Sequence, residues 1–294
     1  MQFYERYLEQ NIFELHEELM TGNYAHGRYE PFTIHDPKQR LIHKATVNDR
    51  LLHQAIVSAI EPNFERQFIY DSYSCRIGKG SHAGVKRLQT FLRRASKNNT
   101  QTVYALKCDI KQFFASMDHA ILRQLLGNQV QDLQVMQLLD QVINSLSGDL
   151  GKGIPLGNIT SQLFANVYLH ELDWYIKHVL KEKHYLRYCD DFIIISNSRE
   201  YLEELVHPMA QFLEQRLKLA LHPDKVTIRT WSQGIDFLGY VTKPYCTVLR
   251  NKTKDRMLDK ANQANITSYL GLCSHADAHE LENVLKLKTW TNSM

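Results

Sequence analysis

The stretch KHYLRYCDDFIII, residues 183–195, decides how the rest of the chain is interpreted. Residues 183–187 lead into Tyr188-Cys189-Asp190-Asp191, and the apolar, mostly β-branched run 192–195 follows. This pattern predicts a strand, a two-residue turn and a second strand, with both aspartates at the hairpin tip. Adjacent like charges repel, so either water or a divalent cation has to compensate them. Taken alone, an Asp-Asp turn is more typical of a solvated turn than of a metal site.

Length and composition indicate an ordinary globular protein. The chain has 294 residues, of which 44% are hydrophobic and 23% charged, enough for one large or two modest cores. No apolar run is long enough to cross a bilayer, and residues 1–20 have amphipathic helical spacing rather than the pattern of a secretion signal. We therefore expect a cytoplasmic protein without a membrane partner. Five scattered cysteines without a Cys-x-x-Cys pair argue against disulfides and zinc.

Positive charge is concentrated in one part of the chain. Between Asp36 and Lys97 there are twelve Lys or Arg residues and five Asp or Glu residues, a surplus of seven, although the whole chain carries only +3. Such a surplus suits a polyanionic partner, and a solvated basic face is an equally good explanation on charge alone.

Two segments in this basic region are candidates for phosphate contacts. Short strands at 32–35 and 40–43 flank Asp36-Pro37-Lys38-Gln39, which predicts a hairpin with Lys38 and Arg40 near its tip. A glycine-rich loop carrying Arg76 then precedes a basic helix that begins near Ser81. Solvated turns would show the same patterns.

A third acid follows a short apolar strand at residues 103–108. Asp109 ends that strand, and Phe113 and Phe114 come shortly after it. Asp109 could instead cap a helix that starts near Met117, with both rings in the core. Together with Asp190 and Asp191, however, it supplies the acids needed to hold two divalent ions for phosphoryl transfer.

The remaining segments predict helices at 118–126, 132–146 and 199–220 and a long helix after the loop Pro155-Leu156-Gly157-Asn158. The stripe of apolar residues on that long helix, Phe164, Tyr168, Leu172, Tyr175 and Val179, predicts a core face. A turn at 222–225 precedes a strand to Thr230 and a second strand at 235–241, and the basic, helical C-terminal segment predicts a small subdomain.

Taken together, these motifs resemble those of reverse transcriptases from about Pro31 to Tyr245. The strand ending in Cys108-Asp109 resembles the first catalytic motif, and Tyr188-Cys189-Asp190-Asp191 resembles the Tyr-x-Asp-Asp box. Residues 222–225, His-Pro-Asp-Lys, resemble the lysine-bearing motif, and residues 237–240, Phe-Leu-Gly-Tyr, resemble the primer grip. The resemblance implies an α+β right-hand polymerase, with fingers and an antiparallel-sheet palm in residues 1–245 and a small helical thumb in 246–294.

The same resemblance implies roles for individual residues. Asp109, Asp190, Asp191 and the Ile110 carbonyl would bind two Mg²⁺ ions, for which Mn²⁺ could substitute, and Lys225 would protonate pyrophosphate. Phe114 would exclude the 2′-hydroxyl of ribonucleotides. The other nucleotide contacts would come from Lys38, Arg40, Arg76, Leu156 and Gly157, and the primer grip from Phe237, Leu238, Gly239 and Tyr240.

One loop narrows the resemblance. Most reverse transcriptases carry Gln-Gly-x-x-x-Ser-Pro before the long helix, whereas residues 156–162 here are Leu-Gly-Asn-Ile-Thr-Ser-Gln. This variant is similar to the reverse transcriptases of diversity-generating retroelements, which are encoded by bacteria or phages. Those enzymes copy a template RNA into cDNA with errors at adenines and work with a small basic accessory protein. Retron-type or group II intron-like enzymes are the alternative, and a catalytically silent RNA-binding protein is a third.

Overall fold

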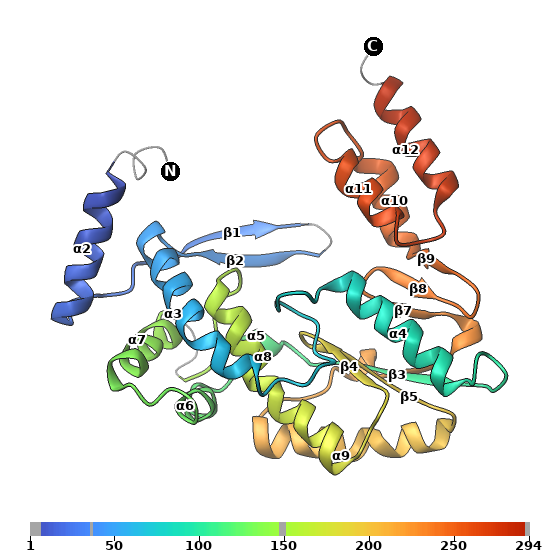
Figure 1. Ribbon diagram of the computed structural model, residues 1–294, viewed down its shortest axis with the longest axis horizontal. Helices are drawn as coiled ribbons and strands as arrows, with labels where there is room; N and C mark the ends of the chain where they lie inside the picture. The colour runs from blue at the N-terminus through green and yellow to red at the C-terminus, as the bar shows by residue number, and fades with distance from the viewer. Residues whose placement is uncertain (1–6, 36–37, 147–150, 292–294) are drawn as a thin grey trace. The chain divides into compact units, whose positions relative to one another are not determined.

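The computed structural model describes residues 7–35, 38–146 and 151–291, which contain helices and antiparallel strands (Figure 1). These residues form two units. The first unit comprises Met1–Tyr70, Ile110–Tyr175 and Ala210–Leu221, and the second comprises Asp71–Asp109, Ile176–Met209 and His222–Met294. Each unit therefore contains segments that lie far apart in the sequence.

The centre of the second unit is a four-stranded antiparallel sheet with the order β4-β5-β3-β6. Its strands are β3 (Tyr104–Asp109), β4 (Tyr185–Tyr188), β5 (Asp191–Ser196) and β6 (Thr227–Thr230). Residues 192–195 of β5 are all buried, because this inner strand is covered on both faces. The predicted strands around the Asp-Asp pair are therefore confirmed.

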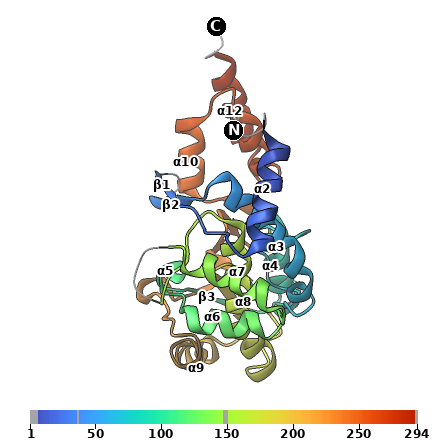
Figure 2. The ribbon, with the colours of Figure 1, turned by 90° about the vertical axis from the view of Figure 1, so that its left-hand side faces the viewer.

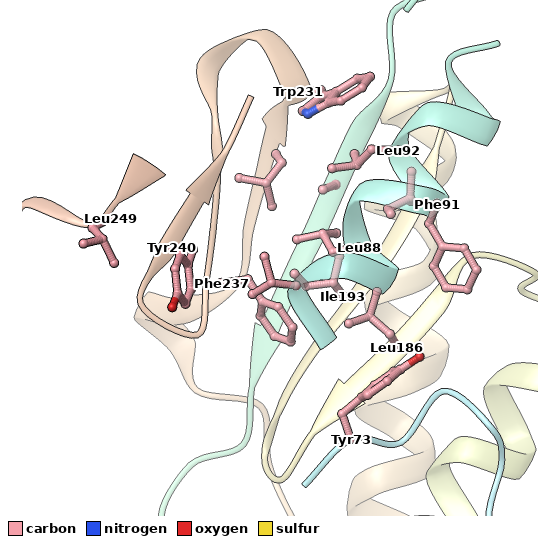
Figure 3. Close-up of a cluster of buried hydrophobic side chains, with 14 of the residues drawn as sticks. Tyr73, Leu88, Phe91, Leu92, Leu186, Ile193, Trp231, Phe237, Tyr240 and Leu249 are labelled. Carbon is pink, nitrogen blue, oxygen red and sulfur yellow. The ribbon is translucent and has the colours of Figure 1, made fainter. Parts of the chain in front are cut away.

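Helix α4 (Ser81–Ala95) packs on this sheet and on a second, three-stranded sheet of the same unit. The second sheet contains β7 (Ile235–Phe237), β8 (Tyr240–Thr242) and β9 (Thr247–Leu249). Figure 3 shows the apolar cluster between these elements, which includes Tyr73, Leu88, Phe91, Leu92, Leu186, Ile193, Trp231, Phe237, Tyr240 and Leu249. Burial of these side chains fixes α4 and both sheets against one another.

Three helices close the second unit after β9. They are α10 (Asn251–Lys260), α11 (Ile266–Cys273) and α12 (His279–Thr291), and they lie together in both views (Figure 1; Figure 2). Met257, Cys273 and Leu285 on these helices belong to the same apolar cluster as the sheets.

The first unit consists of helices and an exposed two-stranded hairpin. Its elements are α2 (Leu8–Thr21), β1 (Glu30–Ile34), β2 (Arg40–Lys44), α3 (Val47–Glu65), α5 (Phe113–Ser116), α6 (His119–Gly127), α7 (Leu133–Asn144) and α8 (Ile159–Trp174). Helix α9 (Arg199–Leu217) contributes residues to both units. Residues 1–6 of the predicted first helix and the hairpin-tip residues Asp36 and Pro37 lie outside the described part.

Side-chain caps determine where several helices of this unit begin. Thr46 and Asp49 form a reciprocal capping box at α3, and the carboxylates of Asp118 and Asp132 accept backbone N–H bonds at the starts of α6 and α7. Because Asp118 caps α6, the alternative in which Asp109 caps this helix is wrong.

The structure corrects three sequence-based predictions. The turn before β5 consists of Cys189 and Asp190, so only Asp190 lies at the hairpin tip, and Asp191 already belongs to the strand. The predicted single strand at 235–241 is a hairpin, because Leu238 and Gly239 adopt left-handed φ values of 52° and 90°. Val179 is 53% exposed, because a π-helical turn at Tyr175–Val179 shifts the apolar stripe of α8.

Across the described ranges, we find no helix that combines the length and the apolar character required to span a bilayer.

Candidate active site

Two of the three predicted catalytic aspartates lie opposite each other on neighbouring strands of the central sheet. Asp109 is the last residue of β3 and Asp191 the first residue of β5, and they are directly paired in the antiparallel register. Asp190 precedes Asp191 in the turn, where Cys189 adopts a left-handed φ of 54°. The fold of the second unit thus gathers three carboxylates at the adjoining ends of two inner strands of the sheet.

Two lysines of the same unit form ion pairs with these acids. The Nζ atom of Lys225 lies 2.7 Å from Asp109 Oδ1, and the Nζ atom of Lys107 lies 3.1 Å from Asp191 Oδ2. The backbone N–H of His222 also donates to the Asp109 carbonyl at 2.8 Å, which fastens the short helical turn Pro223–Lys225 beside β3. The lysines supply positive charge where three acids would otherwise repel each other.

Burial makes the ionised form of two of these acids costly. Loss of solvation raises the pKa of the Asp190 carboxyl above its usual range, and the charge of Asp109 adds to that rise. Burial raises the pKa of Asp191 to about 6, although the adjacent Lys107 ammonium favours the ionised form. Added positive charge at these strand ends would therefore stabilise the ionised form of both acids.

The donor set fits hard divalent ions such as Mg²⁺. Carboxylate oxygens are their preferred ligands, and Asp191 Oδ1 is a buried oxygen without a hydrogen-bond partner. With the side chains as they stand, no group of three His, Cys, Asp or Glu residues in the described ranges closes around a common point. Two of the three acids are instead engaged by Lys225 and Lys107. Asp109, Asp190 and Asp191 are nevertheless the residues that could hold such ions.

A buried arginine supports the turn that carries Asp190. Arg187 on β4 has no exposed surface, and its guanidinium donates to the Cys189 carbonyl at 3.0 Å and to Ser72 Oγ at 3.1 Å. Its backbone N–H donates to the Asp71 carbonyl at 2.9 Å. Arg187 therefore hydrogen-bonds the turn of its own hairpin to segment 71–73.

Comparison with known proteins now identifies the family. The model of the family described as reverse transcriptase (RNA-dependent DNA polymerase) matches residues 34–242. The chain belongs to the reverse transcriptase family.

Curated relatives of this reverse transcriptase include bacterial proteins. Protein YkfC of Escherichia coli K12 is 25% identical, with 77% of this chain and 69% of YkfC covered. The group II intron-encoded protein LtrA of Lactococcus lactis is 24% identical, with 79% of this chain and 49% of LtrA covered. The chain thus spans about half the length of LtrA.

Solved structures show that the fold is that of a right-hand polymerase. Telomerase from Candida albicans, in complex with a fragment of telomeric RNA, aligns with a TM-score of 0.57 at 10% identity, covering 87% of this chain and 53% of that chain. Apo telomerase from Candida tropicalis aligns with a TM-score of 0.56 at 12% identity, covering 79% and 52%. The expected α+β class is confirmed.

Other predicted site residues of the reverse transcriptase lie in the first unit. Phe113 is buried, whereas Phe114 is partly exposed and its carbonyl accepts a bond from Ile154 N at 2.9 Å. Two residues further, the carbonyl of Leu156 accepts a bond from His43 N on β2 at 2.9 Å.

Gly157 continues the contact of this loop with β2. It has a φ of 107°, and a Cβ placed there would lie 2.6 Å from Ile42 Cγ2. The loop and β2, which begins at Arg40, are thereby joined, and both Arg40 and Lys38 are exposed.

The remaining predicted residues are spread over both units. Ile110 follows Asp109 directly but is counted with the first unit, where it is almost fully buried. In the second unit, Arg76 donates to the Ser72 carbonyl at 2.9 Å.

The predicted primer grip is the β7–β8 hairpin of the second unit. The rings of Phe237 and Tyr240 are buried, and Leu238 and Gly239 form the partly exposed turn between them. The Leu238 side chain packs against the apolar cluster, so the backbone of the turn is the part of the hairpin that can reach a ligand.

Sequence reasoning missed Lys107 and Arg187. A signal was present for both, because each is a charged residue inside an otherwise apolar strand close to a catalytic aspartate. On β3, Lys107 shares a face with Asp109 by strand alternation, which places it diagonally across from Asp191.

Proposed function

We propose that this reverse transcriptase copies an RNA template into DNA, with Asp109, Asp190 and Asp191 as the carboxylate ligands of two Mg²⁺ ions and the Ile110 carbonyl as a further ligand. The observation that carries the proposal is the direct pairing of Asp109 with Asp191, beside the turn that holds Asp190. When bound, such ions activate the primer 3′-hydroxyl and neutralise charge on the triphosphate, and Mn²⁺ can supply the same chemistry.

Lys225 is the proton donor that we assign to the leaving pyrophosphate. Its side chain is 40% exposed while the ammonium contacts Asp109 at 2.7 Å, so it can release a proton to a ligand on its solvent side. A lysine at this place also balances the charge of Asp109 in the protein without nucleotide. Both roles require the cation, which a neutral side chain of similar length would lack.

Residues outside the carboxylate cluster select and hold the substrates. The partly exposed ring of Phe114 opposes a 2′-hydroxyl, and the cations of Lys38, Arg40 and Arg76 contact the triphosphate or the template backbone. The turn at Leu238 and Gly239 holds the primer strand.

The segment 246–294, with helices α10–α12, acts as the thumb, and residues 1–245 supply fingers and palm. The primer strand and deoxynucleoside triphosphates are thus the substrates beside the template RNA. The presence of RNA in the Candida albicans telomerase structure is in keeping with this assignment.

We assign the enzyme to the diversity-generating subclass on the basis of its loop 156–162. Leu156 offers no side-chain donor or acceptor where most reverse transcriptases have glutamine. The loop backbone is nevertheless firmly held, because Asn158 Nδ2 donates to the His43 carbonyl at 3.1 Å. A rigid loop with an apolar side chain would constrain the nascent base pair less than a hydrogen-bonding one. An enzyme of this subclass copies the template RNA with errors at adenines and works together with a small basic accessory protein.

A second candidate is a group II intron-like reverse transcriptase. The observation that favours it is the match of LtrA over 79% of the chain. The two candidates differ in their products, since only the diversity-generating enzyme should misread template adenines far more often than the other bases.

The deciding experiment is primer extension on a defined RNA template, followed by sequencing of the cDNA. Extension that requires Mg²⁺ or Mn²⁺ and disappears in Asp190→Asn supports the polymerase, and errors concentrated at adenines support the diversity-generating subclass. Uniform errors would favour the intron-like enzyme. If RNA binds but no primer is extended with either ion, the chain is a silent RNA-binding protein and the polymerase proposal fails.

A further inference from the structure

Lys107 touches two functional parts of the second unit at the same time. Its Nζ lies 3.1 Å from Asp191 Oδ2 and donates to the backbone carbonyl of Asp236 at 3.0 Å. Asp236 belongs to β7, the first strand of the hairpin whose turn is Leu238-Gly239. One ammonium group therefore joins a carboxylate of the candidate metal site to the candidate primer grip.

The contacts continue from Asp236 to the first C-terminal helix. Asp236 Oδ1 accepts a bond from Arg250 Nε at 2.8 Å, and the backbone N–H of Arg250 donates to the Gly239 carbonyl at 2.9 Å. Arg250 is also the residue that precedes α10 as its N-cap. The path Asp191–Lys107–Asp236–Arg250–Gly239 is thus made entirely of hydrogen bonds and ion pairs.

The two oxygens of Asp191 have different environments. Lys107 engages Oδ2, while Oδ1 is buried and has no partner. With the carboxylate held through Oδ2, its rotation is restricted and Oδ1 is the atom left to accept another ligand. Lysine suits this position because one ammonium has three donors and can serve two acceptors from a single stem.

We propose that Lys107 is a positioning residue that couples Asp191 to the β7–β8 hairpin, so that the metal ligand and the primer-holding turn keep a fixed spacing. This inference rests on the proposed polymerase function, but the coupling itself is a property of the protein without substrate. The test perturbs one end of this path of contacts and observes the other.

The test compares Lys107→Met, which keeps the stem and removes the ammonium, with Lys107→Arg, which keeps the charge and several donors. Arg229→Met is the matched control, because Arg229 is an exposed cation on the neighbouring strand β6 of the same sheet. Amide hydrogen exchange is measured first, on protein free of divalent ions and nucleic acid. Steady-state primer extension is measured second, with nucleotide KM and kcat determined separately.

We expect the Arg250 amide, which bonds to Gly239 in the hairpin turn, to exchange about tenfold faster in Lys107→Met. The reason is that the hairpin loses the hydrogen bond from Lys107 to the Asp236 carbonyl. Lys107→Arg and Arg229→Met should exchange at wild-type rates. In extension, Lys107→Met should lower kcat about tenfold with little change in nucleotide KM, because the reacting groups are misplaced rather than left unbound, and Lys107→Arg should restore most of it.

Unchanged exchange at Arg250 in Lys107→Met would overturn the coupling, and so would an equal loss of kcat in Arg229→Met. A wild-type protein that extends no primer would refute the polymerase proposal, while the exchange result would still decide the coupling. If Lys107→Met fails to fold, Lys107→Arg becomes the test. If the inference is right, its guanidinium still bridges both acceptors, so exchange at Arg250 and most of kcat should be retained, and loss of either would overturn the coupling.

Discussion

Asp109 ends β3 and Asp191 begins β5, and the antiparallel register places these two residues directly opposite each other. Paired acids at the ends of neighbouring strands are unfavourable for the fold unless cations neutralise them. Lys225 and Lys107 do so here, one for each acid. This arrangement favours the binding of further positive charge at the place where we propose that the reaction occurs. The following predictions depend on it and on the other residues described above.

Asp191→Asn should stabilise the protein without divalent ions at pH 7. The pKa of Asp191 is about 6 in the folded protein and near 3.8 when unfolded, so its ionisation weakens the fold as the pH rises through this interval. We expect the variant to gain on the order of 1 kcal/mol in unfolding free energy at pH 7. The gain should vanish near pH 4 (about the unfolded pKa).

Thermal unfolding at both pH values checks this, with Asp255→Asn on α10 as an exposed control. Added Mg²⁺ should raise the melting temperature of the wild type more than that of Asp191→Asn. A variant less stable than the wild type at pH 7 would show that the Lys107 ion pair outweighs the cost of burial.

Acid should destabilise the first unit through His53. Burial lowers the pKa of His53 to about 4, and its Nε2 lies 3.2 Å from His26 Nε2. The ring is neutral in the folded protein, but at a pH below 6.5 it takes up a proton when the protein unfolds. The free energy of unfolding therefore decreases as the pH falls from 6.5 towards 4. His53→Gln should flatten the pH dependence of unfolding in this window, whereas a parallel curve would assign the acid sensitivity to other groups.

Phe114→Ala should admit ribonucleotides. Only the bulk of the partly exposed ring is proposed to oppose the 2′-hydroxyl, so its removal should raise the ratio of ribonucleotide to deoxyribonucleotide incorporation by about tenfold or more. Competitive incorporation on one template measures the ratio, and Phe114→Tyr, which keeps the bulk, should behave like the wild type. An unchanged ratio in the alanine variant would remove Phe114 from this role.

Leu156→Gln should lower errors opposite template adenine. A positioned hydrogen bond worth about 1 kcal/mol changes discrimination several-fold, and glutamine restores a donor and an acceptor at this loop. Sequencing cDNA made by both enzymes at equal nucleotide concentrations gives the comparison, with Leu156→Met as an apolar control. Faithful copying of adenine by the wild type would contradict the subclass assignment.

RNA binding should weaken steeply with salt. Each phosphate contact made by Lys or Arg releases counterions, so the logarithm of the affinity should fall linearly with the logarithm of the salt concentration. Replacing Lys252 and Lys254 at the start of α10 by glutamine should make this slope shallower if the proposed thumb contacts RNA. A flat dependence in the wild type would mean that the basic surplus between Asp36 and Lys97 is only a solvated surface.

The sequence by itself determined the local structure and the family. The β-branched run after Asp191 and the apolar strand before Asp109 were sufficient to place β5 and β3, because strand patterns depend on neighbouring residues. The polar residues Asp118 and Asp132 marked helix starts through their own side-chain caps. The order of the motifs then indicated a reverse transcriptase, and the family model confirmed it.

Only the tertiary structure decided how these pieces meet. The pairing of Asp109 with Asp191 depends on hydrogen bonds between strands far apart in the sequence, and a shift of one residue would have turned one acid to the other face. The bridge from Lys107 to the Asp236 carbonyl involves a backbone atom, which no residue pattern reveals. The sequence did not predict the left-handed turn at Leu238 either. Leucine disfavours that conformation and adopts it only where the buried hairpin requires it.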